Sequence, residues 1–156
     1  MEDRGAEQRA LFRRWPTGVS VVVAESGTRR AGLTVNSLVS LSLEPPLVGI
    51  SLALSASLYE VLRDAGDWTV SMLAADQEQL AQHFARSVPP LVQWDGIAVR
   101  GDDPRLLEHA VGWLHARTVE EIPAGDHTVF IGAVERLEQG PGRGALVYWG
   151  SRYQAL

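Results

Sequence analysis

The chain of 156 residues contains no cysteine, which excludes disulfide bridges, thiolate zinc sites and cysteine nucleophiles. It has no apolar stretch long enough for a signal peptide or a membrane span, so we expect a cytoplasmic protein that does not enter a membrane. Its 19 acidic residues against 14 basic ones give a net charge of −5. Nucleic acid is therefore not an expected partner, because the arginines form no group larger than the pairs Arg13-Arg14 and Arg29-Arg30.

The motifs of the large cofactor-binding folds are also missing. There is no G-x-G-x-x-G after a predicted strand, no P-loop, no H-E-x-x-H and no G-x-S-x-G. This disfavours a Rossmann dehydrogenase and a serine hydrolase. The four histidines, at positions 83, 109, 115 and 127, do not share a spacing that would place two of them on one helical face. We therefore expect no metal site, and we interpret His109 and His115 as structural or surface residues.

What is present is a chain with 46% hydrophobic residues, enough for one domain spanning residues 1–156. Alternating or β-branched segments predict many short strands. They lie at 19–23, 31–35, 37–43, 47–54, 68–73, 111–122, 128–137 and 145–149. The turn at 25–29 predicts a hairpin between the first two strands, and the glycines of 140–144 predict another between the last two. The alternation in 37–43 is typical of a half-buried strand.

Three helices are predicted between these strands. The first covers residues 3–15 and stops before Pro16. The second begins with Ser57 and Glu60 as a capping box, and ends at Gly66. The third starts at Asp76 and buries Phe84. Many short strands with few helices predict a mainly β protein, a closed or nearly closed barrel with helices outside it.

Several small polar segments then occur in a characteristic order. These are Pro16-Thr17-Gly18-Val19, Thr34 to Ser37, Val39 to Val48, Leu73 to Gln77, Phe84-Ala85, Gly125 to Thr128 with Gly132, and Tyr148 to Tyr153. Each segment alone is a weak signal, but together they extend over about residues 10–154. In this respect the chain resembles the flavin reductase family, whose fold is the FMN-binding split β-barrel.

The resemblance implies a homodimer with FMN, or FAD in its place, in a groove at the subunit interface. It implies hydride transfer from NADH or NADPH to the flavin, with reduced flavin passing to a separate monooxygenase. No catalytic side chain is required for this step, because the cofactors carry the chemistry. Two alternatives stay open: a barrel that retains its flavin and acts on an organic substrate itself, and a non-catalytic flavin-binding module.

The resemblance also implies flavin-binding positions. They are Leu33, Thr34, Val35, Asn36, Ser37, Ser40, Ser51, Leu52, Ala53, Ser55, Ser57, Phe84 and Ala85. Main-chain groups of 33–37 would bind the pyrimidine ring, and the serines near the helix start at Ser57 would lie near the phosphate, where free amides favour an anion. The family often has a basic residue in 54–57 and this chain has none, so phosphate binding is modest or an arginine such as Arg86 supplies the charge.

The nicotinamide dinucleotide is expected at two further places. The segment Gly125 to Thr128 is typical of a turn, but the resemblance implies that Asp126 and His127 border the nicotinamide. His127 would hydrogen-bond the dinucleotide or its carboxamide, while Arg152 and Tyr153 would hold the remaining phosphate and the adenine.

Overall fold

The computed structural model describes residues 3–86 and 88–156. Met1, Glu2 and Ser87 lie outside the described residues. The ten strands are β1 Thr17–Gly18, β2 Ser20–Ser26, β3 Arg29–Val35, β4 Val39–Leu43, β5 Pro46–Ala53, β6 Asp67–Met72, β7 Gly112–Ala124, β8 His127–Gln139, β9 Leu146–Trp149 and β10 Arg152–Ala155. The helices are α1 Arg4–Phe12, α2 Ser57–Ala65, α3 Glu78–Ala85 and α4 Pro90–Gln93. Within the described ranges no helix combines the length and apolar character that crossing a membrane requires.

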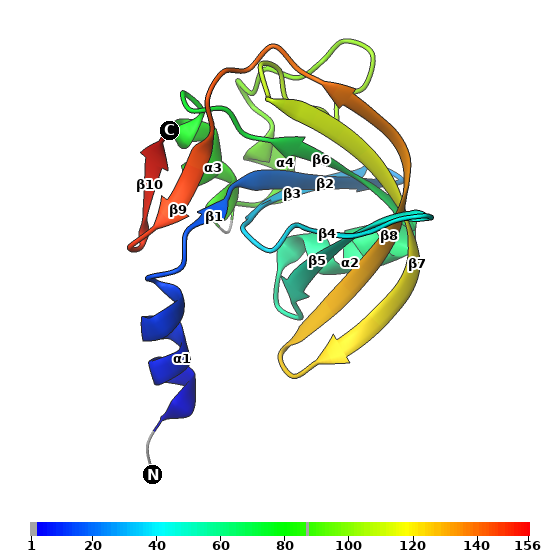
Figure 1. Ribbon diagram of the computed structural model, residues 1–156. Helices are drawn as coiled ribbons and strands as arrows, with labels where there is room; N and C mark the ends of the chain where they lie inside the picture. The colour runs from blue at the N-terminus through cyan, green and yellow to red at the C-terminus, as the bar shows by residue number, and fades with distance from the viewer. Residues whose placement is uncertain (1–2, 87) are drawn as a thin grey trace.

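Seven strands form one curled antiparallel sheet. Its order is β3-β2-β6-β7-β8-β5-β4, and the predicted β2–β3 hairpin is confirmed. The two outer strands, β3 and β4, follow one another in the chain, separated only by residues 36–38. Val35 and Val39 can therefore be at most about 14 Å apart. The sheet must curl until its two edges approach each other, which gives the open barrel in Figure 1.

Strand β2 is buried on both faces, which explains its unbroken apolar sequence. Val22 belongs to the cluster that fills the barrel, which also contains Leu58 and Leu62 of α2. Its neighbours Val21 and Val23 point to the opposite face and pack with α3. One helix therefore covers each face of this strand, and the end of β3 lies between them.

Strand β4 differs from the prediction of a half-buried strand. Val39 and Leu41 are each 47% exposed and Leu43 is 83% exposed. Within the described residues the strand pairs only with β5, and the exposure of these side chains shows that little packs over them.

Two predicted local structures are wrong. Ala56 is the N-cap of α2, and Ser57 is already inside the helix, so the capping box does not form. At α3 the N-cap is Gln77 rather than Asp76. The Gln77 side chain does not cap the helix: it accepts from Ala74 N–H at 2.9 Å and donates to the Glu108 carbonyl at 2.8 Å.

The glycine-rich segment 140–144 is not a hairpin loop, because the strands on its two sides belong to different sheets. Strand β8 is in the large sheet, whereas β9 pairs with β1 and β10 in a separate three-stranded sheet. Strand β10 was not predicted.

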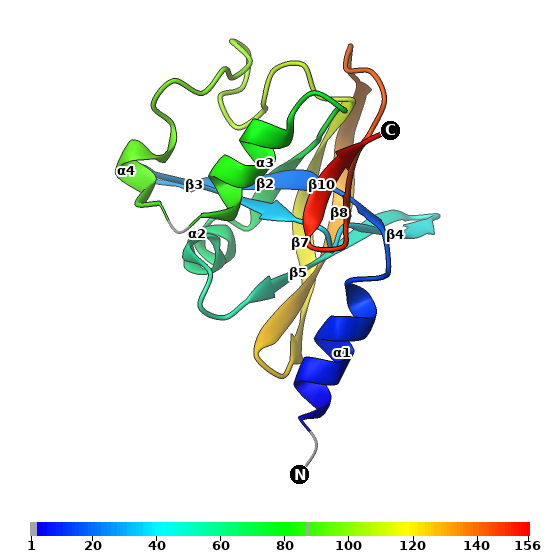
Figure 2. The ribbon, with the colours of Figure 1, turned by 90° about the vertical axis from the view of Figure 1, so that its left-hand side faces the viewer.

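The hairpin β9–β10 is tied to the end of α1 through Gly150 N–H, which donates to the Arg13 carbonyl at 2.8 Å. Helix α1 itself buries no residue and projects from the body in Figures 1 and 2.

A polar network holds the segment before β7 against the outer side of β6 and β7. Asp103 accepts from Arg105 and from His115 Nε2, both at 3.0 Å, and Arg105 also binds Asp67 at 2.8 Å. Burial raises the pKa of the Asp103 carboxyl, but hydrogen bonds from Arg105 and His115 outweigh this and lower it to about 2. His115 therefore has a structural contact, as its position in the sequence suggested.

Candidate functional site

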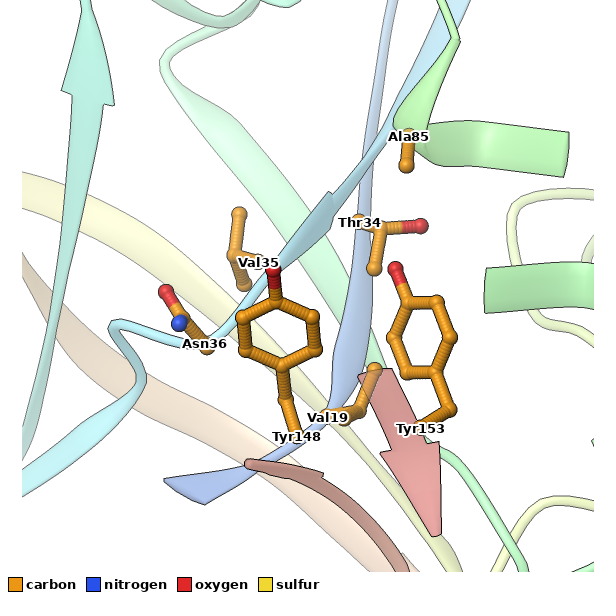
Figure 3. Close-up of a pocket in the computed structure, with 7 residues that line it drawn as sticks. All are labelled: Val19, Thr34, Val35, Asn36, Ala85, Tyr148 and Tyr153. Carbon is orange, nitrogen blue, oxygen red and sulfur yellow. The ribbon is translucent and has the colours of Figure 1, made fainter. Parts of the chain in front are cut away.

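A pocket of about 170 Å³ lies where β3 ends, beside the three-stranded sheet. Three predicted flavin residues of the β3 end, Thr34, Val35 and Asn36, line it together with Ala85 from the end of α3. Figure 3 shows these residues with the rings of Tyr148 and Tyr153 beside them. The structure thus brings two sequence segments of the predicted site, 33–37 and 84–85, to one cavity.

The aromatic side of this pocket comes from β9 and β10. Tyr148 and Tyr153 face each other across the strand pair, with ring centroids 5.2 Å apart. Burial raises the pKa of the Tyr153 phenol, and Tyr148 and Glu78 add to this, so the hydroxyl stays a neutral donor. Tyr148 was not predicted as a site residue. The Gly150-Ser151 pair between the tyrosines was the available signal, because a two-residue turn places them opposite each other.

A second pocket of about 580 Å³ lies on the other side of Asn36. It is lined by Asn36 and Ser37, by the segment from Trp15 to Ser20 and by residues near the start of β9. Thr17 is one of the lining residues, and its hydroxyl oxygen is buried from solvent with no hydrogen-bond partner within the part of the chain that the structure describes. Buried polar groups normally have partners. Because this oxygen is closed off from solvent, a molecule in the pocket does not reach it in this conformation.

Ser37 connects the β3–β4 turn to strand β5. Its Oγ donates to the Ser51 carbonyl at 3.1 Å and accepts from Ser51 N–H at 3.0 Å. These two bonds use the hydroxyl hydrogen and one lone pair, so Ser37 holds the main chain of the turn in place. Leu33, the first residue of the predicted segment, is half-buried and packs against the barrel core.

The predicted residues of β5 divide by face. Ser51 and Ala53 are half-buried and lie on one side of the strand, whereas Leu52 is buried in the core. They pair with β8 so that Ala53 is opposite His127. Thr128, the next residue of β8, has its hydroxyl 2.9 Å from that of Tyr59 on α2. The Ala53 end of β5 and the His127 start of β8 are therefore fixed together.

The segment after β5 carries the two exposed serines, Ser55 and Ser57, on either side of the N-cap of α2. No side chain caps this helix, so the amides of Ser57 and Leu58 are free to bind an anion, whereas Tyr59 N–H donates to the Ala56 carbonyl at 3.0 Å. No basic residue lies in 54–57, as the sequence showed. Arg86 is exposed just beyond the end of α3 and has no recorded contact with this segment.

Asp126 and His127 form a pair at the β7–β8 turn. His127 Nδ1–H donates to Asp126 Oδ1 at 2.7 Å, and this hydrogen bond lowers the pKa of the Asp126 carboxyl. The turn is attached to the end of β5 because Leu54 N–H donates to the Asp126 carbonyl at 3.0 Å. With Nδ1 engaged, His127 presents Nε2 outward, as an acceptor when neutral and a donor when protonated.

Of the thirteen predicted flavin residues, five line one of the two pockets and eight line neither. The eight are Leu33, Ser40, Ser51, Leu52, Ala53, Ser55, Ser57 and Phe84. The Phe84 ring is fully buried and packs against His83 and Trp94, so its side chain supports the pocket from beneath. Ser40 is exposed on β4, opposite Val48, and lines neither pocket described above.

The four predicted dinucleotide residues fall into two groups. Tyr153 lies in the pocket with the β3 end, and Arg152 is its exposed neighbour on β10. Asp126 and His127 lie at the β7–β8 turn, beside the end of β5. Both ribbon views place β10 and this turn far from each other within one chain (Figures 1 and 2).

Comparison with known families gives one match that covers nearly the whole chain. Residues 12–156 match the flavin reductase like domain. Among characterised proteins, the reductase component of 4-hydroxyphenylacetate 3-monooxygenase from Thermus thermophilus is 37% identical over 143 residues, which cover 92% of this chain and 91% of that protein. The actinorhodin polyketide dimerase of Streptomyces coelicolor is 32% identical over 155 residues, covering 99% and 87% of the two chains.

The fold is shared with solved structures as well. An NADH:FAD oxidoreductase of Streptomyces globisporus, in complex with NAD and FAD fragments, superimposes with a TM-score of 0.88. It is 33% identical, and the match covers 99% of this chain and 93% of that one. The predicted fold class, a mainly β split barrel with a few short helices, is confirmed.

Proposed function

The chain belongs to the flavin reductase family, and from this premise we propose that it is an NAD(P)H:flavin oxidoreductase that reduces FMN, or FAD in its place. The observation that carries the proposal is the family match over residues 12–156. That match also supports a single catalytic domain.

The flavin ring is placed beside the end of β3. Its pyrimidine edge needs a donor and an acceptor, and the main chain of 34–36 borders a pocket there. The uncapped amides of Ser57 and Leu58 at the start of α2 are further groups that a polar cofactor can satisfy. The residues present therefore fit a flavin whose phosphate lies near Ser55 and Ser57.

When bound, FMN supplies the electron acceptor, taking a hydride from the reduced nicotinamide at N5. The protein's own residues bind the two cofactors and orient them. Ser37 fixes the turn that borders the ring, and His127 faces the second cofactor with its free Nε2. No side chain has to transfer a proton, so the geometry of approach sets the rate.

A homodimer would explain why the four predicted dinucleotide residues lie in two separate places within one chain. With the groove at the subunit interface, β10 of one copy and the β7–β8 turn of its partner can approach the same ligand. Exposed Val39, Leu41 and Leu43 on β4 offer an apolar surface for this contact. The end of helix α1 and the segment after it offer a second, with Leu11, Phe12 and Trp15 at least 60% exposed. A helix of nine residues that buries nothing is marginal alone, which also supports a partner.

A monooxygenase is the proposed recipient of the reduced flavin. The Thermus thermophilus relative is named as the reductase component of such a system. The phosphate site without a basic residue supports release, because a weakly held flavin can leave after reduction.

One relative favours a second candidate. The Streptomyces coelicolor protein is named a polyketide dimerase, so a barrel of this family that acts on an organic substrate with its flavin retained is a specific alternative.

One experiment separates these functions. The purified protein is mixed anaerobically with FMN and then with NADH, and the visible flavin absorbance is followed, first at equal concentrations and then with FMN in large excess. Bleaching of the whole excess indicates a reductase that releases its product. Bleaching of one equivalent only indicates retained flavin, and no bleaching with NADH or NADPH indicates a binding module and contradicts the proposal.

A further inference from the structure

Gln93, the last residue of α4, has a buried side-chain amide on the free edge of β3. Its Oε1 accepts from Gly32 N–H at 3.0 Å, and its Nε2 donates to the Gly32 carbonyl at 2.9 Å. The side chain is only 1% exposed. An amide that binds both groups of one residue in this way replaces a residue of a neighbouring strand.

The pairing of β3 with β2 shows which groups continue this edge. Gly32 is opposite Val23, and because both of its main-chain groups point to Gln93, this is a non-hydrogen-bonded pair of the ladder. Such pairs alternate along antiparallel strands. Thr34, opposite Val21, must therefore also point its N–H and C=O outward. Outside the β2–β3 ladder, no bond to these two groups is found within residues 3–86 and 88–156.

Gly32 is held on a second side. A Cβ at this position would lie 2.9 Å from the Phe84 ring, so only glycine lets the ring pack directly on the main chain. His83, next to Phe84, places Nε2 2.6 Å from the Gln93 carbonyl. The Thr34 hydroxyl in turn donates to the Ala81 carbonyl at 2.7 Å. Gln93 thus belongs to a set of contacts that fixes the end of β3 against α3.

We propose that Gln93 is a positioning residue for the flavin: its amide occupies the edge of β3 up to Gly32 and holds in place the strand end whose next outward pair, Thr34 N–H and C=O, is left for the ring. The ring edge of a flavin, with its carbonyls and imide N–H, has the same donor and acceptor character as the Gln93 amide. The ring edge would therefore bind the outward main-chain groups of Thr34 as the Gln93 amide binds those of Gly32. This inference rests on the proposed function.

The test compares two substitutions of Gln93 with wild type, using FMN titration and the absorbance spectrum of bound flavin. Gln93→Met keeps the length of the side chain and removes both bonds, and we expect FMN affinity to fall about tenfold. Gln93→Glu keeps the acceptor but loses the donor when ionised. Burial raises a carboxyl pKa. The FMN affinity of Gln93→Glu relative to wild type should therefore be low at about pH 9 and recover at about pH 6.

Trp94→Phe is the matched control. It removes the bond from Trp94 Nε1 to the Arg30 carbonyl, 2.8 Å long and on the same edge but farther from the flavin segment. We expect a lower melting temperature with unchanged FMN affinity.

The inference is overturned if folded Gln93→Met binds FMN like wild type, or if Trp94→Phe weakens binding as much. If Gln93→Met does not fold, the Gln93→Glu pH series decides, and affinity that stays equal to wild type at both pH values overturns it. Wild type that binds no flavin would instead refute the proposed function itself.

Discussion

The Ser37 hydroxyl is bonded to both main-chain groups of Ser51, at 3.1 Å to the carbonyl and 3.0 Å to the N–H. These bonds join the β3–β4 turn to β5 across the open side of the barrel. Ser37→Ala removes both and leaves two half-buried groups unpaired, so we expect a loss of about 1–2 kcal/mol in unfolding free energy.

The same substitution should weaken FMN binding several-fold, because the turn borders the proposed ring site. Denaturant unfolding and FMN titration measure the two effects. Ser42→Ala on β4 is the control, since Ser42 makes no recorded side-chain bond. Equal FMN affinity in Ser37→Ala and wild type would show that the turn does not position the flavin.

His127→Ala should act on the second cofactor. The residue presents Nε2 beside the end of β5, so we expect its loss to raise the KM for NADH and to lower kcat/KM about tenfold. FMN affinity should remain nearly unchanged. Stopped-flow reduction and FMN titration distinguish these outcomes. A variant that loses FMN but is reduced normally when saturated with flavin would place His127 in the flavin site.

Dimer formation should depend on β4. Leu41→Asp places a charge among the exposed apolar side chains of this strand, and we expect the mass in solution to fall toward the 17.0 kDa of one chain. FMN binding should be lost with it. Light scattering after size exclusion gives the mass. Leu91→Asp, at a leucine 90% exposed on α4, is the control that should stay dimeric. A wild-type monomer that binds FMN tightly would contradict the proposed assembly.

Acid should weaken the contact between the segment around Asp103 and β7. The folded pKa of Asp103 is about 2, below its ordinary value of 3.8. A carboxyl with a lowered pKa stabilises the fold above its unfolded pKa and loses this contribution as pH falls through the folded value. We therefore expect part of the stability to disappear between pH 3.8 and about 2. Asp103→Asn should show a smaller change over this interval when unfolding is followed at each pH.

Gly132→Ala tests the packing of the barrel interior. A Cβ on Gly132 would lie 2.7 Å from the Trp68 ring and 2.9 Å from Ala116 Cβ. Because Trp68 is fully buried, we expect a loss of about 1–3 kcal/mol. Gly101→Ala, which meets no atom within 4 Å, should have little effect. Similar melting temperatures for the two variants would contradict this account.

Local patterns in the sequence predicted most of the strands, and non-local contacts explain what they missed. The β2–β3 hairpin follows from a turn between two apolar runs. The separation of β8 from β9 could not be predicted, because nothing local in 140–144 shows that β9 pairs with β1. Strand β10 is four residues long and mostly exposed, so its alternation is too weak to detect.

The prediction of the site residues was also limited by contacts between segments that are distant in the sequence. Family resemblance marked Thr34 and Tyr153, which the structure places in one pocket. It also marked Phe84, whose burial was predicted from the helix pattern and is confirmed, but whose contact with Gly32 no motif encodes. The role of Gln93 depends on hydrogen bonds between distant segments.

The pairing of Ala53 with His127 has a consequence for which sequence changes the protein can tolerate. Successive side chains of a strand point to opposite faces, so deleting one residue from β5 would turn Leu52 out of the core and shift every later residue against β8. Insertions and deletions should therefore be selected against in β5 and β8. Length variation among homologues is expected instead in exposed connections such as the β2–β3 turn at residues 27–28.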